Sequence, residues 1–244
     1  MKKSALFVIF LFLWISFGYA GLLDDVKQQA GILGQAAVPG QGGVDNDTAV
    51  SGLKEALAIG TENAVKSLSQ IDGYFGNSLV KILMPDKIQN VADVLGKAGF
   101  QKHVDDFVLS MNRAAEKAAP EAASIFGDAI RQMSVQDATG IVNGGDTAAT
   151  DYFKTTTSDR IYGAFKPIIS ASINEVGVTQ AYQAMMGKYT SLPFMPSASS
   201  LDLDHYVTTK AMDGLFLQIA AEEKNIRTNP AARVTDVLKR VFGQ

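Results

Sequence analysis

Apolar residues recur at intervals of three, four and seven along most of this chain, and this spacing constrains the fold more than any other feature. The first long stripe consists of Val50, Leu53, Leu57, Ala64, Leu68 and Ile71. Such spacing is typical of helices that bury one face. Comparable stripes predict further helices over residues 86–97, 104–115, 122–133, 135–142, 159–175, 180–189 and 204–227. We therefore expect an all-α fold, a single bundle of about eight to ten helices.

One short run breaks this pattern. Residues 79–84, LVKILM, follow the turn sequence GYFGN at 73–77 and are closed by Pro85. Short apolar runs bounded by turn residues are typical of strands. The sequence therefore leaves room for one short two-stranded element.

Polar residues that favour helix N-caps precede several predicted helices. Ser158 stands before 159–175 and Thr179 before 180–189, while Asn229, followed by Pro230, precedes the final apolar stripe. Pro is favoured at the first position of a helix. We expect separate helices to begin at each of these points.

The stretch DATGIVNGGDTAATDYFK, residues 137–154, resembles a ligand loop because acidic residues flank a Gly-Gly pair. A phosphate loop would need a Lys after the glycines, and an EF-hand would need Gly at its sixth position. Neither requirement is met, so we interpret the stretch as a corner between helices. Ser134 and Asp137 predict a capping box, Asn143-Gly144-Gly145 a turn with positive φ, and Asp146 or Thr147 the next cap.

The first 47 residues differ from the rest. Lys2 and Lys3 precede an apolar run of about 13 residues that ends before Gly18-Tyr19-Ala20, which is the layout of a secretory signal peptide over residues 1–20. The alternative, a retained anchor, would need roughly 20 apolar residues. Residues 21–47 are rich in Gly, Gln and Pro, which predicts a weakly ordered lead-in, and residues 48–244 form the predicted all-α domain. We expect a periplasmic or secreted protein without a membrane span in its mature chain.

The absence of cysteine and a formal net charge of −3 exclude several kinds of site and partner. Without cysteine there is no disulfide, thiolate metal site or thiol nucleophile. A nucleic-acid-binding protein would show a basic patch, and a surface for anionic lipids would also be basic. The two histidines, His103 and His205, lack partners at metal-ligand spacing. We expect no metal, no cofactor and no nucleic acid.

Carboxylates are the remaining candidates for catalysis. Glu116 and Glu121 flank an Ala-rich joint between helices, and Glu222-Glu223 lie near the end of a long helix. Two such groups on facing helices would suit the acid and base of a glycosidase. However, Arg113 precedes Glu116 by three residues and Arg227 follows Glu223 by four, which are ion-pair spacings within helices. We hypothesise that Arg113, Glu116, Glu223 and Arg227 form a structural ionic network between helices.

The loop SLPFMPSASS at 191–200 carries the only candidate contact residues that lie off the helical stripes, namely Leu192, Phe194 and Met195. Folding back over the bundle is one interpretation of this loop. The other is a lip over an apolar groove, or a contact with a partner or a membrane surface.

Several longer motifs resemble a bacterial family, domain of unknown function 4197 (DUF4197). They are GLKEAL at 52–57, MNRAAEKAAPEA at 111–122, AIRQMSVQDATGIVNGGDTAATDYF at 129–153, DGLF at 213–216 and EEKNIRTNPAARVTDVLKRVFG at 222–243. The resemblance covers residues 22–243 and implies an exported helical protein. It carries no activity or site residue to transfer.

Two function classes follow. The first is a non-catalytic module that binds an apolar ligand or an envelope protein partner. The second is a carboxylate-dependent hydrolase acting on an envelope polymer, which should hold two carboxylates with displaced pKa values in a wet cleft. The scarcity of His and the lack of Cys favour binding over catalysis.

Overall fold

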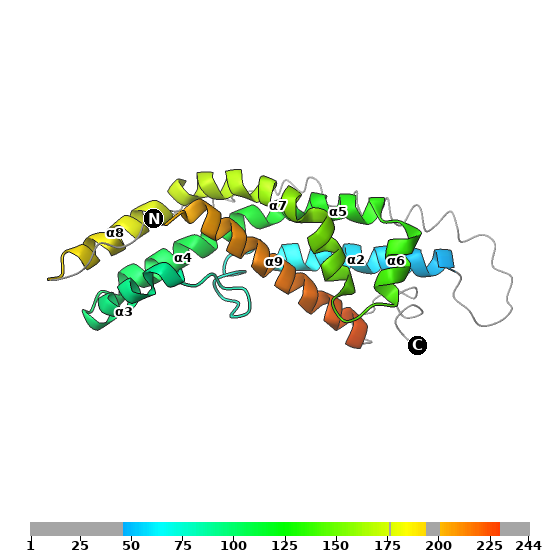
Figure 1. Ribbon diagram of the computed structural model, residues 1–244, viewed down its shortest axis with the longest axis horizontal. Helices are drawn as coiled ribbons and strands as arrows, with labels where there is room; N and C mark the ends of the chain where they lie inside the picture. Colours follow the sequence, from blue (N-terminus) through cyan, green and yellow to red (C-terminus); the bar gives the residue numbers. More distant parts are fainter. Residues whose placement is uncertain (1–45, 176, 194–200, 230–244) are drawn as a thin grey trace, which may run out of the picture. The chain divides into compact units, whose positions relative to one another are not determined.

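The computed structural model describes residues 46–175, 177–193 and 201–229 (Figure 1), and these residues form an all-α fold, as predicted. All the described residues belong to one compact unit. Its elements are α2 (Asn46–Leu68), η1 (Asp86–Ile88), α3 (Gln89–Lys97), α4 (Gln101–Ala118), η2 (Ala119–Glu121), α5 (Ala122–Gln132), α6 (Val135–Val142), α7 (Ala148–Glu175), α8 (Val178–Thr190) and α9 (Leu203–Thr228).

The helices pack in two groups that share α7 and α9 (Figure 1). Helices α3, α4 and α8 contact one another, as α2 contacts α5 and α6. Helix α7 packs along α9, and both also contact α4. The buried stripes meet in an aromatic cluster in which Phe126 lies edge-on to Phe153 and Phe216. Burial of these apolar faces, more than helix propensity, holds such helices in place.

The predicted capping box at the beginning of α6 is confirmed. The hydroxyl of Ser134 accepts the N–H of Asp137, and the carboxylate of Asp137 accepts the N–H of Ser134. Both bonds of the capping box are therefore present. The hydroxyl of Ser134 also donates to the carboxylate of Asp137, and this bond, followed by the one from the N–H of Ser134, holds the pKa of Asp137 below its usual value. After α3, Gly99 has φ of 81°, and the N–H of Phe100 donates to the carbonyl of Leu95, which is the geometry that Gly permits at a helix C-terminus.

The corner after α6 corrects one prediction. Gly144 and Gly145 do not have positive φ. Gly144 is required by close packing instead, because a Cβ there would lie 2.6 Å from the Cβ of Ala148 and 2.8 Å from the carbonyl oxygen of Gly140. Nothing lies within 4 Å of the corresponding position at Gly145.

Helix α7 corrects another prediction, since no helix begins at Ser158. The hydroxyls of Thr155, Thr156, Thr157 and Ser158 each donate to the carbonyl four residues earlier in the same helix. Hydroxyl side chains can either cap a helix or bond back into it, and here they do the second. Pro167 lies inside this helix.

Helices α8 and α9 occur close to where they were predicted. Helix α8 begins after Gly177, which has φ of 83°, and α9 begins after Asp202, whose carboxylate accepts the N–H of His205. Asn229 ends α9, and the predicted helix behind it lies outside the described residues, as do residues 1–45. None of the described helices combines the length and apolar character needed to span a membrane.

Candidate binding surface

Residues 69–85, which we call the clamped loop, connect α2 to η1. This loop carries most of the exposed large apolar side chains of the described residues. Ile71, Leu83 and Leu79 are 80%, 63% and 53% exposed. Ile71 was predicted to face the core, but α2 ends at Leu68 and places Ile71 in the following turn. Apolar side chains clustered on the surface of a folded protein mark candidate interaction sites.

Helix α4 holds the first half of this loop through a buried carboxylate. Glu116 is 5% exposed, and its Oε1 accepts the N–H groups of Tyr74 at 3.1 Å and Phe75 at 3.3 Å. The other oxygen, Oε2, accepts Nη1 of Arg113 at 2.6 Å. Arg113 also donates to Asp72 at 2.7 Å. One arginine therefore joins the loop to the helix that supports it.

Asp72 has an unusual backbone conformation at this point. Its φ is 67°, and it is the one residue other than Gly with positive φ in the described part of the chain. Asp tolerates the left-handed region better than most residues but still incurs strain there. The ion pair with Arg113 and the bond from the N–H of Gly76 to the carbonyl of Asp72 both lie at this turn. Strain that is held by surrounding contacts is frequent at functional sites.

The second half of the loop turns at residues 78–80 and then continues without helix or turn to Pro85, and this last part pairs with a side chain instead of a strand. The N–H of Ile82 donates to Oδ1 of Asn112 at 2.8 Å, and Nδ2 of Asn112 donates to the carbonyl of Ile82 at 2.9 Å. Asn112 is completely buried in α4. Its amide thus satisfies both backbone groups that a neighbouring strand would satisfy. The two-stranded element is absent from the described residues.

Helix α9 fixes the loop from its other side. The ring of Tyr74 is buried against Gly214, where a Cβ would lie 2.8 Å from Cε1, and its hydroxyl donates to the carbonyl of Ala211 at 2.8 Å. Burial, together with the carboxylate of Glu116, raises the pKa of Tyr74. Tyr206 donates to the carbonyl of Leu83 at 3.0 Å. The loop is therefore bonded to both α4 and α9 although its apolar side chains are exposed.

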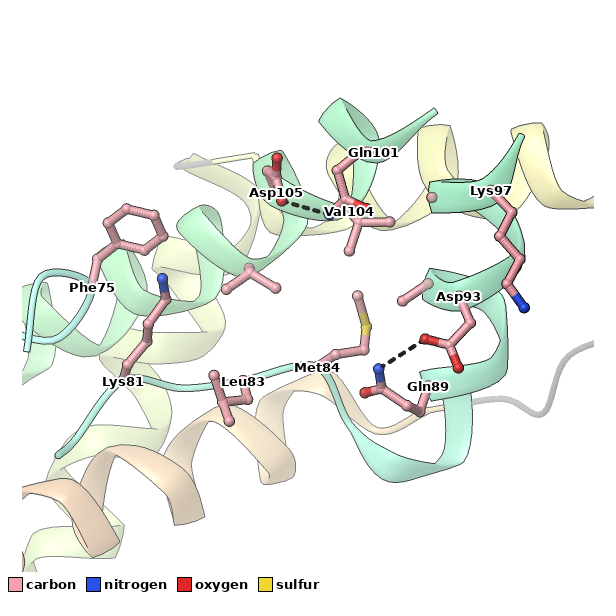
Figure 2. A pocket seen from close by; sticks show the side chains of 13 residues that line it. Phe75, Lys81, Leu83, Met84, Gln89, Asp93, Lys97, Gln101, Val104 and Asp105 are labelled. Atoms are coloured by element: carbon pink, nitrogen blue, oxygen red, sulfur yellow. Dashed lines mark hydrogen bonds between the residues drawn. The ribbon is translucent and has the colours of Figure 1, made fainter. Parts of the chain in front are cut away.

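An open groove of about 860 Å³ lies between the clamped loop and the α3–α4 hairpin (Figure 2). Its apolar surface comes from Phe75, Leu83 and Met84 of the loop and from Val104 and Val108 of α4. The rim carries charges of both signs: Lys81, Lys97, Asp93 and Asp105. Nζ of Lys81 lies 3.9 Å from the ring centroid of Phe75, a cation–π contact that keeps the ammonium group beside the groove.

The structure separates the four residues of the hypothesised network into two places. Arg227 donates to Glu223 at 2.9 Å, and Glu223 also accepts the N–H groups of Ala149 and Thr150 at the beginning of α7. The pair Arg113–Glu116 instead supports the clamped loop. Glu116 accepts the N–H of Tyr74, and Tyr74 in turn donates to the carbonyl of Ala211 in α9. Ala211 lies roughly 18 Å along α9 from Glu223. Each pair therefore fixes its own contact between elements.

Neither buried carboxylate is arranged for acid–base catalysis. Both oxygens of Glu116 and of Glu223 accept hydrogen bonds from backbone or arginine donors. A general acid or base must instead reach a substrate proton. His205 contacts the hydroxyl of Tyr162 at 3.0 Å, and His103 packs near Phe100. In residues 46–175, 177–193 and 201–229, no group of three or more His, Asp or Glu side chains is placed to hold a metal.

Most of the segment 191–200, for which one interpretation was a lip over an apolar groove, lies outside the described residues. Leu192 is partly exposed after α8, whereas Phe194 and Met195 lie outside the described residues. Their contact with a groove stays a prediction.

A family model described as a protein of unknown function, DUF4197, matches residues 43–243. The chain belongs to this family. No curated protein and no solved structure shows significant similarity to it. The site of this DUF4197 protein must therefore be argued from its own geometry, and the match covers the clamped loop, the groove and both buried carboxylates.

Sequence reasoning missed most of this surface. Among its residues only Arg113 and Glu116 were singled out, because their spacing predicts an ion pair. Leu83 belonged to a run that was interpreted as a possible strand, and Asn112 is one polar residue on a helix. The available signal was the apolar run LVKILM next to a Gly-rich turn without a second strand in the sequence to pair with it.

Proposed function

We propose that this DUF4197 protein is an exported, non-catalytic binding module whose clamped loop and groove engage a protein partner in the cell envelope. The observation that carries the proposal is the rigid display of Leu79, Leu83 and Ile71 by a loop bonded to two helices. Apolar side chains in a fixed loop lose little conformational freedom on binding, so their burial converts efficiently into affinity.

The shape of the groove favours a protein over a small apolar ligand. Sites for small molecules enclose most of the ligand surface. This groove is open, and Leu83 at its edge is largely exposed. An apolar centre with a charged rim is the usual composition of a protein interface. The envelope location rests on the signal-like layout of residues 1–20.

Site-specific photocrosslinking in the native host tests this proposal. A benzoyl-phenylalanine residue replaces Leu83 or Leu79 in one set of strains and Val135 in another. Val135 is the matched control because it is an apolar residue with the same 53% exposure as Leu79 and lies on α6, away from the loop. We expect a discrete protein adduct from Leu83 and Leu79 after irradiation. Adducts of equal yield from Val135, or none from the loop, would contradict the proposal.

A further inference from the structure

The clamped loop borders a second hollow on the side away from the groove. This hollow, of about 390 Å³, is lined by the loop, α7 and α9. Its inner wall is apolar and consists of the buried residues Val80, Ile82 and Phe216. Leu79 and Leu217 are exposed at its edge. Lys81 lines both the hollow and the groove, so the two share one wall.

The charge at this hollow differs from that of the chain as a whole. Lys154 from α7 and Lys210 from α9 line it, with Asp213 as the one acidic residue there. Lys210 is 3.4 Å from Asp213, a loose contact between exposed side chains. Lys154 has no ion-pair partner among the described residues. The hollow is thus locally basic in a protein of formal net charge −3.

We propose that this hollow receives an acidic residue and an adjoining apolar residue from the protein partner. The inference rests on the proposed function and names the chemistry of the partner's segment. The apolar residue fits against Phe216 and Leu217, while the carboxylate lies near the ammonium groups of Lys154 and Lys210. Complementary charges at the edge of an interface select partners and speed their association. The small size of the hollow and the net negative charge of the chain disfavour an anionic membrane surface as the binding partner.

Peptide selection provides a test without a known partner. Random peptides displayed on phage are selected on the full chain, and the enriched peptides are then synthesised and titrated by fluorescence anisotropy. We expect enrichment of Asp or Glu next to a large apolar residue. The double variant Lys154→Glu, Lys210→Glu should bind those peptides on the order of tenfold more weakly, because like charges then meet. The matched control is Lys66→Glu, Lys224→Glu, which makes the same charge change at exposed lysines outside the hollow and should retain affinity.

The other outcomes separate this inference from the proposed function. The enriched peptides could instead be apolar without an acidic preference, and bind wild type and the double variant equally but fail to bind Leu83→Asp. That result would overturn the role of the hollow and leave the proposed function of the loop intact. If no peptide is enriched, or if the enriched peptides bind both Leu83→Asp and the double variant unchanged, both proposals fail. Sedimentation with vesicles of phosphatidylglycerol and phosphatidylcholine completes the test. Vesicle binding that requires Lys154 and Lys210 would replace the protein partner with a lipid headgroup.

Discussion

Glu223, near the end of α9, accepts the backbone N–H of Thr150 at the beginning of α7 at 2.9 Å. The same carboxylate accepts the N–H of Ala149 and the hydroxyl of Thr150. A helix N-terminus leaves unpaired N–H groups and carries partial positive charge, so a carboxylate there is doubly favourable. Asp146 or Thr147 was predicted to cap α7, but the bonded carboxylate belongs to a residue 73 positions after Thr150.

Removing this carboxylate should strongly destabilise the protein. Glu223→Ala removes the acceptor of two buried N–H groups and the carboxylate that pairs with Arg227, which keeps its bond to the carbonyl of Ile141, and Glu223 is only 7% exposed. The expected loss is about 3–5 kcal/mol of unfolding free energy, measured by urea titration. Glu121→Ala, at an exposed glutamate, is the control and should change stability by less than about 0.5 kcal/mol. A loss under about 1 kcal/mol for Glu223→Ala would show that the bonds are dispensable.

Removing the charge of the neighbouring Glu222 should instead stabilise the protein near pH 7. Burial raises its pKa, although hydrogen bonds with Asn63 and Gln218 partly counteract this. The folded chain therefore binds more protons than the unfolded chain above the ordinary pKa of 4.5, so the free energy of unfolding falls as the pH rises through this window. Glu222→Gln removes the ionisation and should be more stable than wild type near pH 7, with the difference vanishing toward acid pH. Urea midpoints across this range decide the matter, and a pH-independent difference would contradict the assignment.

Replacing Asn112 should lower the free energy of unfolding strongly. Asn112→Leu keeps the volume but leaves the buried N–H and carbonyl of Ile82 unpaired, at about 1–3 kcal/mol for each group. We also expect faster hydrogen exchange at the Ile82 amide. Ser110→Ala is the comparison, since that hydroxyl bonds only within α4, to Phe107. Equal protection of Ile82 in both variants would refute the role of Asn112.

The positive φ of Asp72 predicts an order of stability for two substitutions. Asp72→Gly loses an exposed ion pair worth about 0.2–1 kcal/mol but relieves backbone strain. Asp72→Ala loses the same pair and keeps the strain. The Ala variant should therefore be less stable than the Gly variant by about 1 kcal/mol in thermal unfolding. The reverse order would mean that the turn changes shape when the ion pair is removed.

Gly144 and Gly145 should respond differently to the same substitution. Gly144→Ala places a Cβ within 2.8 Å of the carbonyl oxygen of Gly140 and even closer to Ala148. Overpacking of this kind costs about 1–3 kcal/mol. Gly145→Ala meets no atom within 4 Å and should be neutral, or stabilising by up to about 1 kcal/mol. Differential scanning calorimetry of the two variants makes the comparison. Equal melting temperatures would contradict it.

The sequence predicted those features that depend on neighbouring residues. Apolar stripes located α4, α5 and α9 because helical period and burial act over a few turns. The capping box of Ser134 was predictable for the same reason. Ser158 was mistaken for a cap because a hydroxyl bonds equally well to an N–H ahead of it or a carbonyl behind it.

The binding surface depends on contacts that sequence spacing does not reveal. Asn112 meets Ile82 across 30 positions, and Glu116 meets Tyr74 across 42. A single polar residue on a helix has no periodic partner that would indicate such a role. The groove exists only because α3, α4 and the loop are placed together, and that placement follows from packing of the whole unit.

The bond between Asn112 and Ile82 also bears on aggregation. Residues 79–84, LVKILM, form a short apolar segment with β-branched residues and one charge, the composition of segments that stack into cross-β fibrils. In the folded chain, the amide of Asn112 occupies the N–H and carbonyl through which Ile82 would join another strand. Loss of that cover would leave both backbone groups of Ile82 open to pairing with another strand. The same segment that displays Leu79 and Leu83 to a partner thus becomes a fibril-forming segment when α4 releases it.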